Sequence, residues 1–134
     1  MDIEIKKGLI PPMDKVLALY DDCGWTAYTD EPEILEKAIK NSLEVLTLWD
    51  GEILVGLART VGDGATICYL QDILILNSYQ GKGLGTRLLD QVLADNDHIR
   101  QFILLTEDAH KNRNFYRKLG LEPVASAGCI SFMK

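Results

Sequence analysis

The sequence has few of the residues that build disulfide, metal or membrane-spanning structures: three cysteines, two histidines and four prolines among 134 residues. Cys23, Cys68 and Cys129 are widely spaced and form no Cys-x-x-Cys pair, so a zinc or dithiol site has no basis. No apolar run approaches the roughly 20 residues that cross a bilayer. Reduced thiols, and a start rich in acids and lysines, predict a cytoplasmic protein with no membrane partner.

Positive charge is also in short supply, with 14 Lys and Arg against 20 Asp and Glu, a net charge of −6. An acidic surface repels phosphate backbones, so we expect no nucleic-acid partner. The same surface attracts cationic amines, although acidity is equally explained by solubility alone. The length and a hydrophobic content of 47% predict one domain over residues 1–134.

The first half of the chain predicts helices set against antiparallel strands. Alternation over residues 3–6 indicates a first strand. Helices are expected after Pro12 and from Pro32, the second capped by Asp30. Strand-forming residues on both sides of Asp50-Gly51 predict a hairpin over residues 43–61, because glycine accepts the positive φ of a tight turn.

The second half predicts a parallel crossover. A long strand over residues 66–76 ends in a continuous apolar run, which suits a central strand. A helix then begins near Leu84, and another buried strand covers residues 102–105, an order that implies a right-handed parallel connection. Asp108 can cap a last helix, and residues 123–125 and 130–133 are expected to form a final strand pair.

Between the long strand and its helix lies the segment Gln80-Gly81-Lys82-Gly83-Leu84-Gly85. Backbone N–H groups at a helix N-terminus form an anion site, glycines allow close approach, and a lysine adds positive charge. The Walker A pattern fails because Gly83 follows Lys82, and the dinucleotide fingerprint fails because Thr86 replaces its third glycine. The segment matches the remaining pattern, Gln/Arg-x-x-Gly-x-Gly/Ala. The alternative to a phosphate site is a tight glycine turn that binds no ligand.

At this point the sequence resembles the GNAT superfamily, whose acetyl-CoA pyrophosphate loop has that pattern. A second motif, Asn114-Phe115-Tyr116-Arg117-Lys118-Leu119-Gly120-Leu121, is similar to the Phe-Tyr-x-x-Leu-Gly-Phe signature of the superfamily, with Leu121 in place of Phe. The resemblance covers nearly the whole chain. It implies an α/β (α+β) fold with a mixed, mostly antiparallel sheet, a splayed parallel strand pair and about four flanking helices.

The resemblance also implies an acetyl-CoA site. In such enzymes the cofactor arm lies in the splay and bonds to strand backbone, while the loop holds the pyrophosphate. Asn112 is a candidate to replace a common cofactor-contacting Asn, because Ala109 stands at that position. The cofactor-binding residues implied are Ile73, Leu74, Ile75, Gln80, Gly81, Lys82, Gly83, Leu84, Gly85, Thr86 and Asn112.

The resemblance implies direct attack of a primary amine on the thioester, with Tyr116 as general acid. A phenol has a pKa of about 10, close enough to that of a thiol to protonate a thiolate. A core aromatic is the alternative for Tyr116. Asp72 is a weak catalytic candidate that could instead hold Arg59 or backbone, and a bulge near it would aim an N–H at the thioester carbonyl. Glu107 and a water relay are further candidates for the base.

The acceptor amine is not readable from the sequence. Trp25 and Tyr28 could hold a cation over their rings or could pack in the core. Tyr69 and Gln71 are further candidates to bind the acceptor, because they are polar side chains on the strand before the loop, on one face by alternation unless a bulge intervenes. Two other functions stay open: a non-catalytic acyl-CoA-binding regulatory module on the same fold, and a domain that binds another phosphate compound. The superfamily also makes a homodimer possible.

Overall fold

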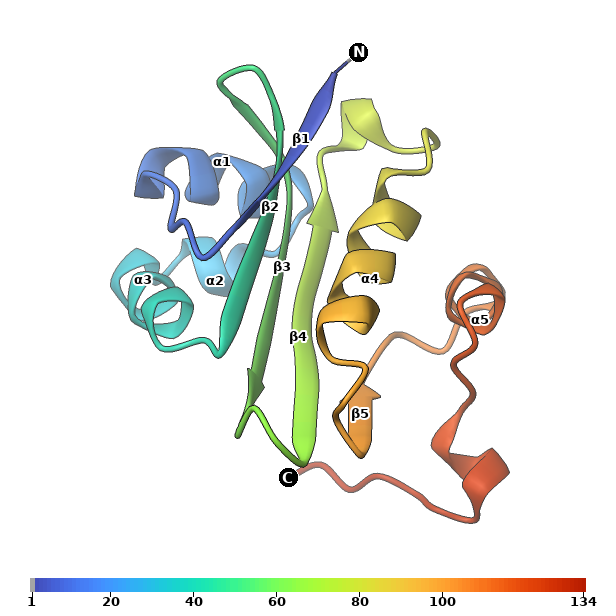
Figure 1. Ribbon diagram of the computed structural model, residues 1–134. Helices are drawn as coiled ribbons and strands as arrows, with labels where there is room; N and C mark the ends of the chain where they lie inside the picture. The colour runs from blue at the N-terminus through green and yellow to red at the C-terminus, as the bar shows by residue number, and fades with distance from the viewer. Residues whose placement is uncertain (1) are drawn as a thin grey trace.

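The structure, a computed structural model, describes residues 2–134 as one mixed sheet between two groups of helices (Figure 1). The sheet has the order β1-β2-β3-β4-β5, with every pair antiparallel except β4 and β5. Its strands are β1 (Ile3–Lys7), β2 (Glu44–Asp50), β3 (Ile53–Gly62), β4 (Ile67–Ile75) and β5 (Gln101–Leu104). The α-helices are α1 (Met13–Asp22), α2 (Thr26–Thr29), α3 (Pro32–Lys40), α4 (Leu84–Asp95) and α5 (His110–Lys118). The mixed, mostly antiparallel fold class is confirmed.

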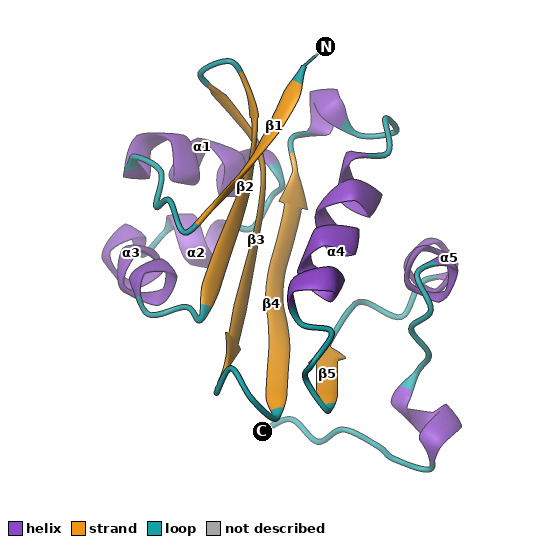
Figure 2. Ribbon diagram, viewed as in Figure 1, coloured by secondary structure: helices purple, strands orange, loops and turns teal. Residues whose placement is uncertain are grey.

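The helices divide between the two faces of the sheet, and each face has its own core (Figure 2). On one face α1 and α3 bury Leu19, Tyr20 and Leu35 against the strands. On the other face α4 buries a stripe that includes Leu88 and Leu89, as its apolar periodicity predicted. No helix in residues 2–134 is long and apolar enough to cross a bilayer.

The predicted hairpin is confirmed: β2 and β3 join at Gly51, which has a φ of +58°. Pro32 opens α3 as expected, but the cap assignment to Asp30 is wrong. Glu31 occupies the N-cap position and makes no side-chain capping bond. The short helix α2 lies where the sequence predicted a loop, because four residues are too few for a detectable apolar period.

The sheet splays between β4 and β5. These strands pair in parallel only where Ile67–Leu70 faces Gln101–Leu104, so residues 72–75 of β4 pair with β3 alone. The predicted bulge is present: Arg59 faces Asp72 while Thr60 faces Leu70, which leaves Gln71 as the extra residue. The bulge reverses the alternation, so Leu70 packs on the α4 side while Asp72 meets Tyr20 on the α1 side.

The end of the chain departs from the prediction. The expected strand pair over residues 123–125 and 130–133 is wrong: a short 3₁₀ helix, η2 (Val124–Ala127), and an extended exposed tail stand there. The cap assignment to Asp108 is also wrong, because Ala109 is the N-cap of α5 and Asp108 instead pairs with Arg113 at 2.6 Å. Both signals are local: the Asp108 carboxylate bonds to Arg113 and does not cap the helix, and the strand pattern near the C-terminus finds no partner strand among the described residues.

Candidate active site

The glycine loop presents unpaired backbone donors. Gly81 and Gly83 have φ values of +78° and +77°, which L-residues with a side chain rarely adopt, and Gly83 is the N-cap of α4. Among residues 2–134, no acceptor takes a hydrogen bond from the N–H groups of residues 81–86, whereas the N–H of Arg87 reaches the Gly83 carbonyl at 3.1 Å. Free N–H groups at the positive end of a twelve-residue helix suit a phosphate.

These donors border a cavity of about 360 Å³, here called the donor cavity, between the glycine loop, β4 and α5. It is lined by thirteen residues from segments far apart in the sequence, three of which are aromatic: Tyr79, Phe115 and Tyr116. Its lining includes Ile73, Ile75, Gln80, Gly81, Gly83, Leu84, Gly85, Thr86, Asn112 and Tyr116. Nine of these are among the eleven cofactor-binding residues that the resemblance implied, so the structure places most of that predicted set around one space.

Three of the predicted cofactor-binding residues do not offer a free side chain to the donor cavity. Leu74 is buried in the core on the opposite face, so only its backbone can serve the splay. Lys82 is exposed and does not line the donor cavity. Gln80 lines the donor cavity, but its side-chain amide is already hydrogen-bonded within the protein. Nε2 donates to the Ile75 carbonyl at 3.0 Å and to Asn77 Oδ1 at 3.1 Å.

A second space of about 400 Å³, here called the acceptor cavity, lies beyond the end of β5. Trp25 and Gln71 form part of its wall, and Thr106 and Glu107 form another part. Ile73, Asn112 and Tyr116 line both cavities. The two spaces therefore meet at the splay, which is the arrangement that a two-substrate reaction requires.

Tyr116 is half-buried where the cavities meet. Burial raises the pKa of its phenol, and an interaction with the Thr106 side chain opposes that rise only in part. The phenol is therefore protonated at neutral pH and can donate a proton. One turn earlier on α5, the Asn112 amide donates to the Glu107 carbonyl at 3.1 Å, which ties the helix to the loop that carries Glu107.

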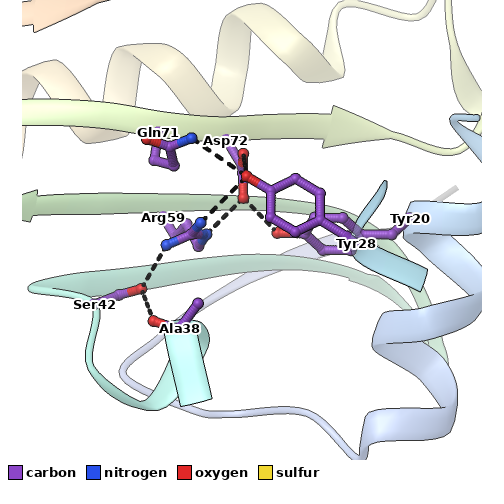
Figure 3. A network of polar contacts seen from close by, with 7 residues as sticks. All are labelled: Tyr20, Tyr28, Ala38, Ser42, Arg59, Gln71 and Asp72. Atoms are coloured by element: carbon purple, nitrogen blue, oxygen red, sulfur yellow. Dashed lines mark hydrogen bonds and ion pairs between the residues drawn. The ribbon is translucent and has the colours of Figure 1, made fainter. Parts of the chain in front are cut away.

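Asp72 belongs to a buried polar network (Figure 3). Only 2% of its side chain is exposed. Arg59 Nε lies 2.5 Å from Asp72 Oδ2, and the hydroxyls of Tyr20 and Tyr28 donate to the carboxylate at 2.9 and 3.1 Å. Burial opposes the charge on Arg59, yet Asp72 raises the pKa of that guanidinium, so Arg59 stays charged. Asp72 borders neither cavity.

The network also accounts for the predicted acceptor residues. Tyr28 accepts a hydrogen bond at 3.3 Å from Gln71 Nε2, which leaves the Gln71 carbonyl oxygen for the acceptor cavity. Trp25 packs against Tyr20 and Tyr28, with ring centroids 5.8 and 6.1 Å apart, and still borders that cavity. Tyr69 faces Ile103 where β4 and β5 remain paired, and it lines neither cavity.

Sequence reasoning missed several lining residues. Lys111 and Phe115 border the donor cavity, and Thr106 borders the acceptor cavity. The motif around Tyr116 contained Phe115, so its helical spacing from Asn112 was the available signal. Nothing in the sequence marks Lys111 or Thr106. Residues 2–134 contain no group of three His, Cys, Asp or Glu side chains that could hold a metal ion.

Comparison with known proteins agrees with this architecture. A family profile described as Acetyltransferase (GNAT) domain matches residues 18–130. The chain belongs to the GNAT family. The GNAT-family acetyltransferase SP0256 of Streptococcus pneumoniae is 37% identical in sequence, and its structure superposes with a TM-score of 0.88 over 99% of this chain and 97% of that one.

Two curated relatives match over a shorter stretch. The Gibberella zeae protein FG08082, named as an acetyltransferase, is 39% identical over 71 residues, or 51% of this chain and 39% of its own. The thialysine N-epsilon-acetyltransferase of Mus musculus is 37% identical over 68 residues, 48% of this chain and 40% of its own. The matched part of the chain thus spans about two fifths of each curated relative.

Proposed function

We propose that this GNAT domain, residues 1–134, is an acetyl-CoA-dependent N-acetyltransferase that acts on a primary amine. The observation that carries the proposal is the meeting of the donor and acceptor cavities at Tyr116. One cavity begins at the free N–H groups of residues 81–86, which suit a pyrophosphate. The other has polar groups and an aromatic wall, which suit an amine.

The fit to acetyl-CoA rests on backbone geometry. The unpaired side of β4 over residues 71–75 offers strand hydrogen bonds to an extended amide-bearing arm. The bulge at Gln71 interrupts the regular pairing, and a backbone N–H freed there would donate to the thioester carbonyl of bound acetyl-CoA. Acetyl-CoA, when bound, supplies an activated acetyl group; the chain supplies its orientation and the protons.

Tyr116 would act as the general acid. Its phenol keeps the proton at neutral pH because burial raises its pKa, and Tyr116 lines both cavities, so it would donate that proton to the departing thiolate. The incoming amine must lose a proton, and Glu107 or a water beside it is the group on the acceptor side that can accept one. Asp72, held by Arg59 and two tyrosines, would position Tyr28 and Gln71 rather than accept that proton.

The acceptor is a primary amine of a small molecule or of a protein, and the name of the Mus musculus relative, a thialysine N-epsilon-acetyltransferase, favours a small-molecule amine. Glu107 adds negative charge at the acceptor cavity, in line with the net charge of −6. We place the enzyme in the cytoplasm, on the reduced cysteines expected from the sequence, and expect a homodimer.

The test is an assay of free thiol released from acetyl-CoA with a panel of amines: thialysine, lysine, polyamines, aminoglycosides and peptide N-termini. Release that depends on one amine class, and that falls in Tyr116→Phe, supports the transferase. Saturable acetyl-CoA binding with no release for any amine would favour the alternative, a regulatory acyl-CoA-binding module on the same fold.

A further inference from the structure

The hydroxyl of Tyr28 uses its one proton and also accepts two hydrogen bonds (Figure 3). It donates the proton to Asp72 Oδ1 at 3.1 Å. Its oxygen accepts from Arg59 Nη2 at 3.4 Å and from Gln71 Nε2 at 3.3 Å. Asp72 also accepts from Arg59 Nε and from the Tyr20 hydroxyl, so its carboxylate acts only as an acceptor there. The Tyr28 proton is therefore held on Asp72, and none is left to point at Gln71.

This arrangement fixes which end of the Gln71 side chain faces Tyr28. A hydroxyl oxygen whose proton is used elsewhere can only accept, so the Gln71 group beside it must be the NH₂ and not the carbonyl. If the amide were turned over, two oxygens would face each other with no hydrogen between them. The Gln71 carbonyl oxygen is thus directed away from Tyr28. Gln71 lines the acceptor cavity, whereas Tyr28 does not.

Packing holds the Tyr28 ring in the position that this hydrogen bond requires. The ring lies edge to face against Tyr20, with centroids 5.2 Å apart, and the Arg59 guanidinium carbon lies 5.9 Å from its centroid. Tyr20 and Asp72 are almost completely buried. A rigid, buried group therefore orients Gln71, whose own side chain is exposed. Support of this kind preorganises a binding contact.

We propose that Gln71 is a specificity-determining residue of the acceptor cavity and that Tyr28 is its positioning residue. In this assignment, which rests on the proposed N-acetyltransferase activity, the Gln71 carbonyl oxygen accepts the N–H that the acceptor nitrogen keeps through the reaction. Gln71 is the bulge residue where the splay between β4 and β5 opens. Ile73, two residues further along β4, lines both cavities, so the reacting nitrogen lies beside this part of the strand.

A neutral primary amine has two N–H bonds, and only one of them is lost in the reaction. The nitrogen lone pair forms the C–N bond to the acetyl group as the C–S bond breaks. One N–H proton passes to Glu107 or a water beside it, and Tyr116 protonates the departing thiolate. The second N–H remains in the amide product and stays bonded to Gln71. An N-methylated amine has a single N–H, which it must give up, so Gln71 would lose its donor. Gln71 thus selects primary amines over N-methylated ones.

The selectivity is tested with a matched pair of probes, thialysine and its derivative methylated at the side-chain nitrogen. Thiol release gives kcat/KM, and mass spectrometry identifies the acetylated nitrogen. Wild type should favour the primary amine by ~30-fold or more. Gln71→Met keeps the length of the side chain and removes its oxygen, so this preference should fall about tenfold or more. A Gln71→Met variant that keeps the wild-type preference would show that space alone excludes the methyl group, and would overturn the assignment.

The positioning role is tested by Tyr28→Phe, with Tyr20→Phe as the matched control. Each variant removes one hydroxyl donor to Asp72 and keeps a ring, but only the Tyr28 hydroxyl bonds to Gln71. Tyr28→Phe should raise the KM for thialysine about tenfold, with kcat within about threefold and acetyl-CoA affinity unchanged. Tyr20→Phe should lower stability and leave that KM nearly unchanged. Equal effects of the two variants on KM would overturn the role of Tyr28.

A double-variant comparison separates positioning from a general disturbance of the fold. If Tyr28 acts through Gln71, Tyr28→Phe should change the KM for thialysine less than about twofold when Gln71→Met is already present. A purely structural role for Tyr28 would give the same factor in both backgrounds, and that result would overturn the proposal.

NMR relaxation of the side-chain amides tests the hold on Gln71 without any substrate. The Gln71 NH₂ group should be more rigid than that of Gln101, an exposed glutamine whose side chain makes no hydrogen bond within residues 2–134. Tyr28→Phe should abolish the difference. A Gln71 amide as mobile as that of Gln101 in wild type would overturn the inference. Failure of the proposed function gives a different result: no amine releases thiol, while the Gln71 amide still responds to Tyr28→Phe.

Discussion

Tyr116 lies one helical turn after Asn112 on α5, and both side chains border the donor cavity and the acceptor cavity. Asn112 donates a hydrogen bond to the Glu107 carbonyl, which links the helix to the loop after β5. Tyr116 thus lines both cavities where β4, α5 and that loop come together. The chemistry of the proposed reaction depends on this placement.

Replacing Tyr116 with Phe removes the proton donor and keeps the ring. We expect kcat to fall ~10²- to 10⁴-fold, since general acid catalysis contributes that much, while the dissociation constant of acetyl-CoA changes less than about threefold. Thiol release and calorimetry measure the two quantities. Lys118→Ala, at an exposed position on the same helix that lines neither cavity, is the control for a general disturbance of α5. Unchanged turnover in Tyr116→Phe would contradict the acid assignment.

The pH profile follows from the raised pKa of Tyr116. A general acid works in its protonated form, so activity is lost as pH rises through the pKa of the folded protein. Because burial places that pKa above the ordinary value of about 10, kcat/KM should show no falling limb from Tyr116 below about pH 10. A rising limb from deprotonation of the amine is expected instead. A falling limb centred below pH 9 that disappears in Tyr116→Phe would refute the assignment.

The ion pair between Arg59 and Asp72 predicts a large stability effect. Asp72→Ala leaves the Arg59 guanidinium buried without a counter-charge, so the free energy of unfolding should fall by about 3–5 kcal/mol. Glu36→Ala removes an exposed helical pair with Lys40 and should cost only about 0.3–0.5 kcal/mol. Urea unfolding compares the two. Recovery of stability in the double variant Asp72→Leu with Arg59→Met would confirm that the loss of stability came from the unpaired charge. A loss below about 1 kcal/mol in Asp72→Ala would contradict this account of the ion pair.

The positive φ of Gly83 predicts that a substitution there weakens acetyl-CoA binding. An alanine at its φ of +77° costs roughly 1–2 kcal/mol and disturbs the N–H groups that begin α4. Gly83→Ala should therefore weaken acetyl-CoA binding at least tenfold. Gly51→Ala introduces the same strain in the β2–β3 turn and should lower stability without that loss of affinity. Equal affinity of the two variants for acetyl-CoA would contradict the assignment of the glycine loop to the donor site.

The sequence was informative where local chemistry dictates structure. Asp50-Gly51 and the alternation beside it predicted the hairpin, and the glycines of residues 81–85 predicted a strand-to-helix loop, because positive φ leaves few other choices. The bulge beside Asp72 came from the resemblance to GNAT proteins, and Gln71 proved to be the extra residue. Of the predicted cofactor set, only Leu74 and Lys82 fail to line the donor cavity.

Other features depend on contacts between distant elements. The partners of Asp72 come from α1, α2 and β3, so no local pattern could separate a catalytic carboxylate from one held by Arg59. Lys111 enters the donor cavity only because α5 lies opposite the glycine loop. Strand propensity over residues 130–133 was real, but a strand needs a partner, and none stands beside it in this chain.

The most direct test of the central claim is calorimetric titration of the folded wild-type protein with acetyl-CoA, and in parallel with ATP and NAD. Saturable binding of acetyl-CoA alone, weakened by Gly83→Ala and retained by Tyr116→Phe, is the predicted result. Absence of acetyl-CoA binding by protein shown to be folded, or equal binding of ATP or NAD, would contradict the assignment of the donor cavity.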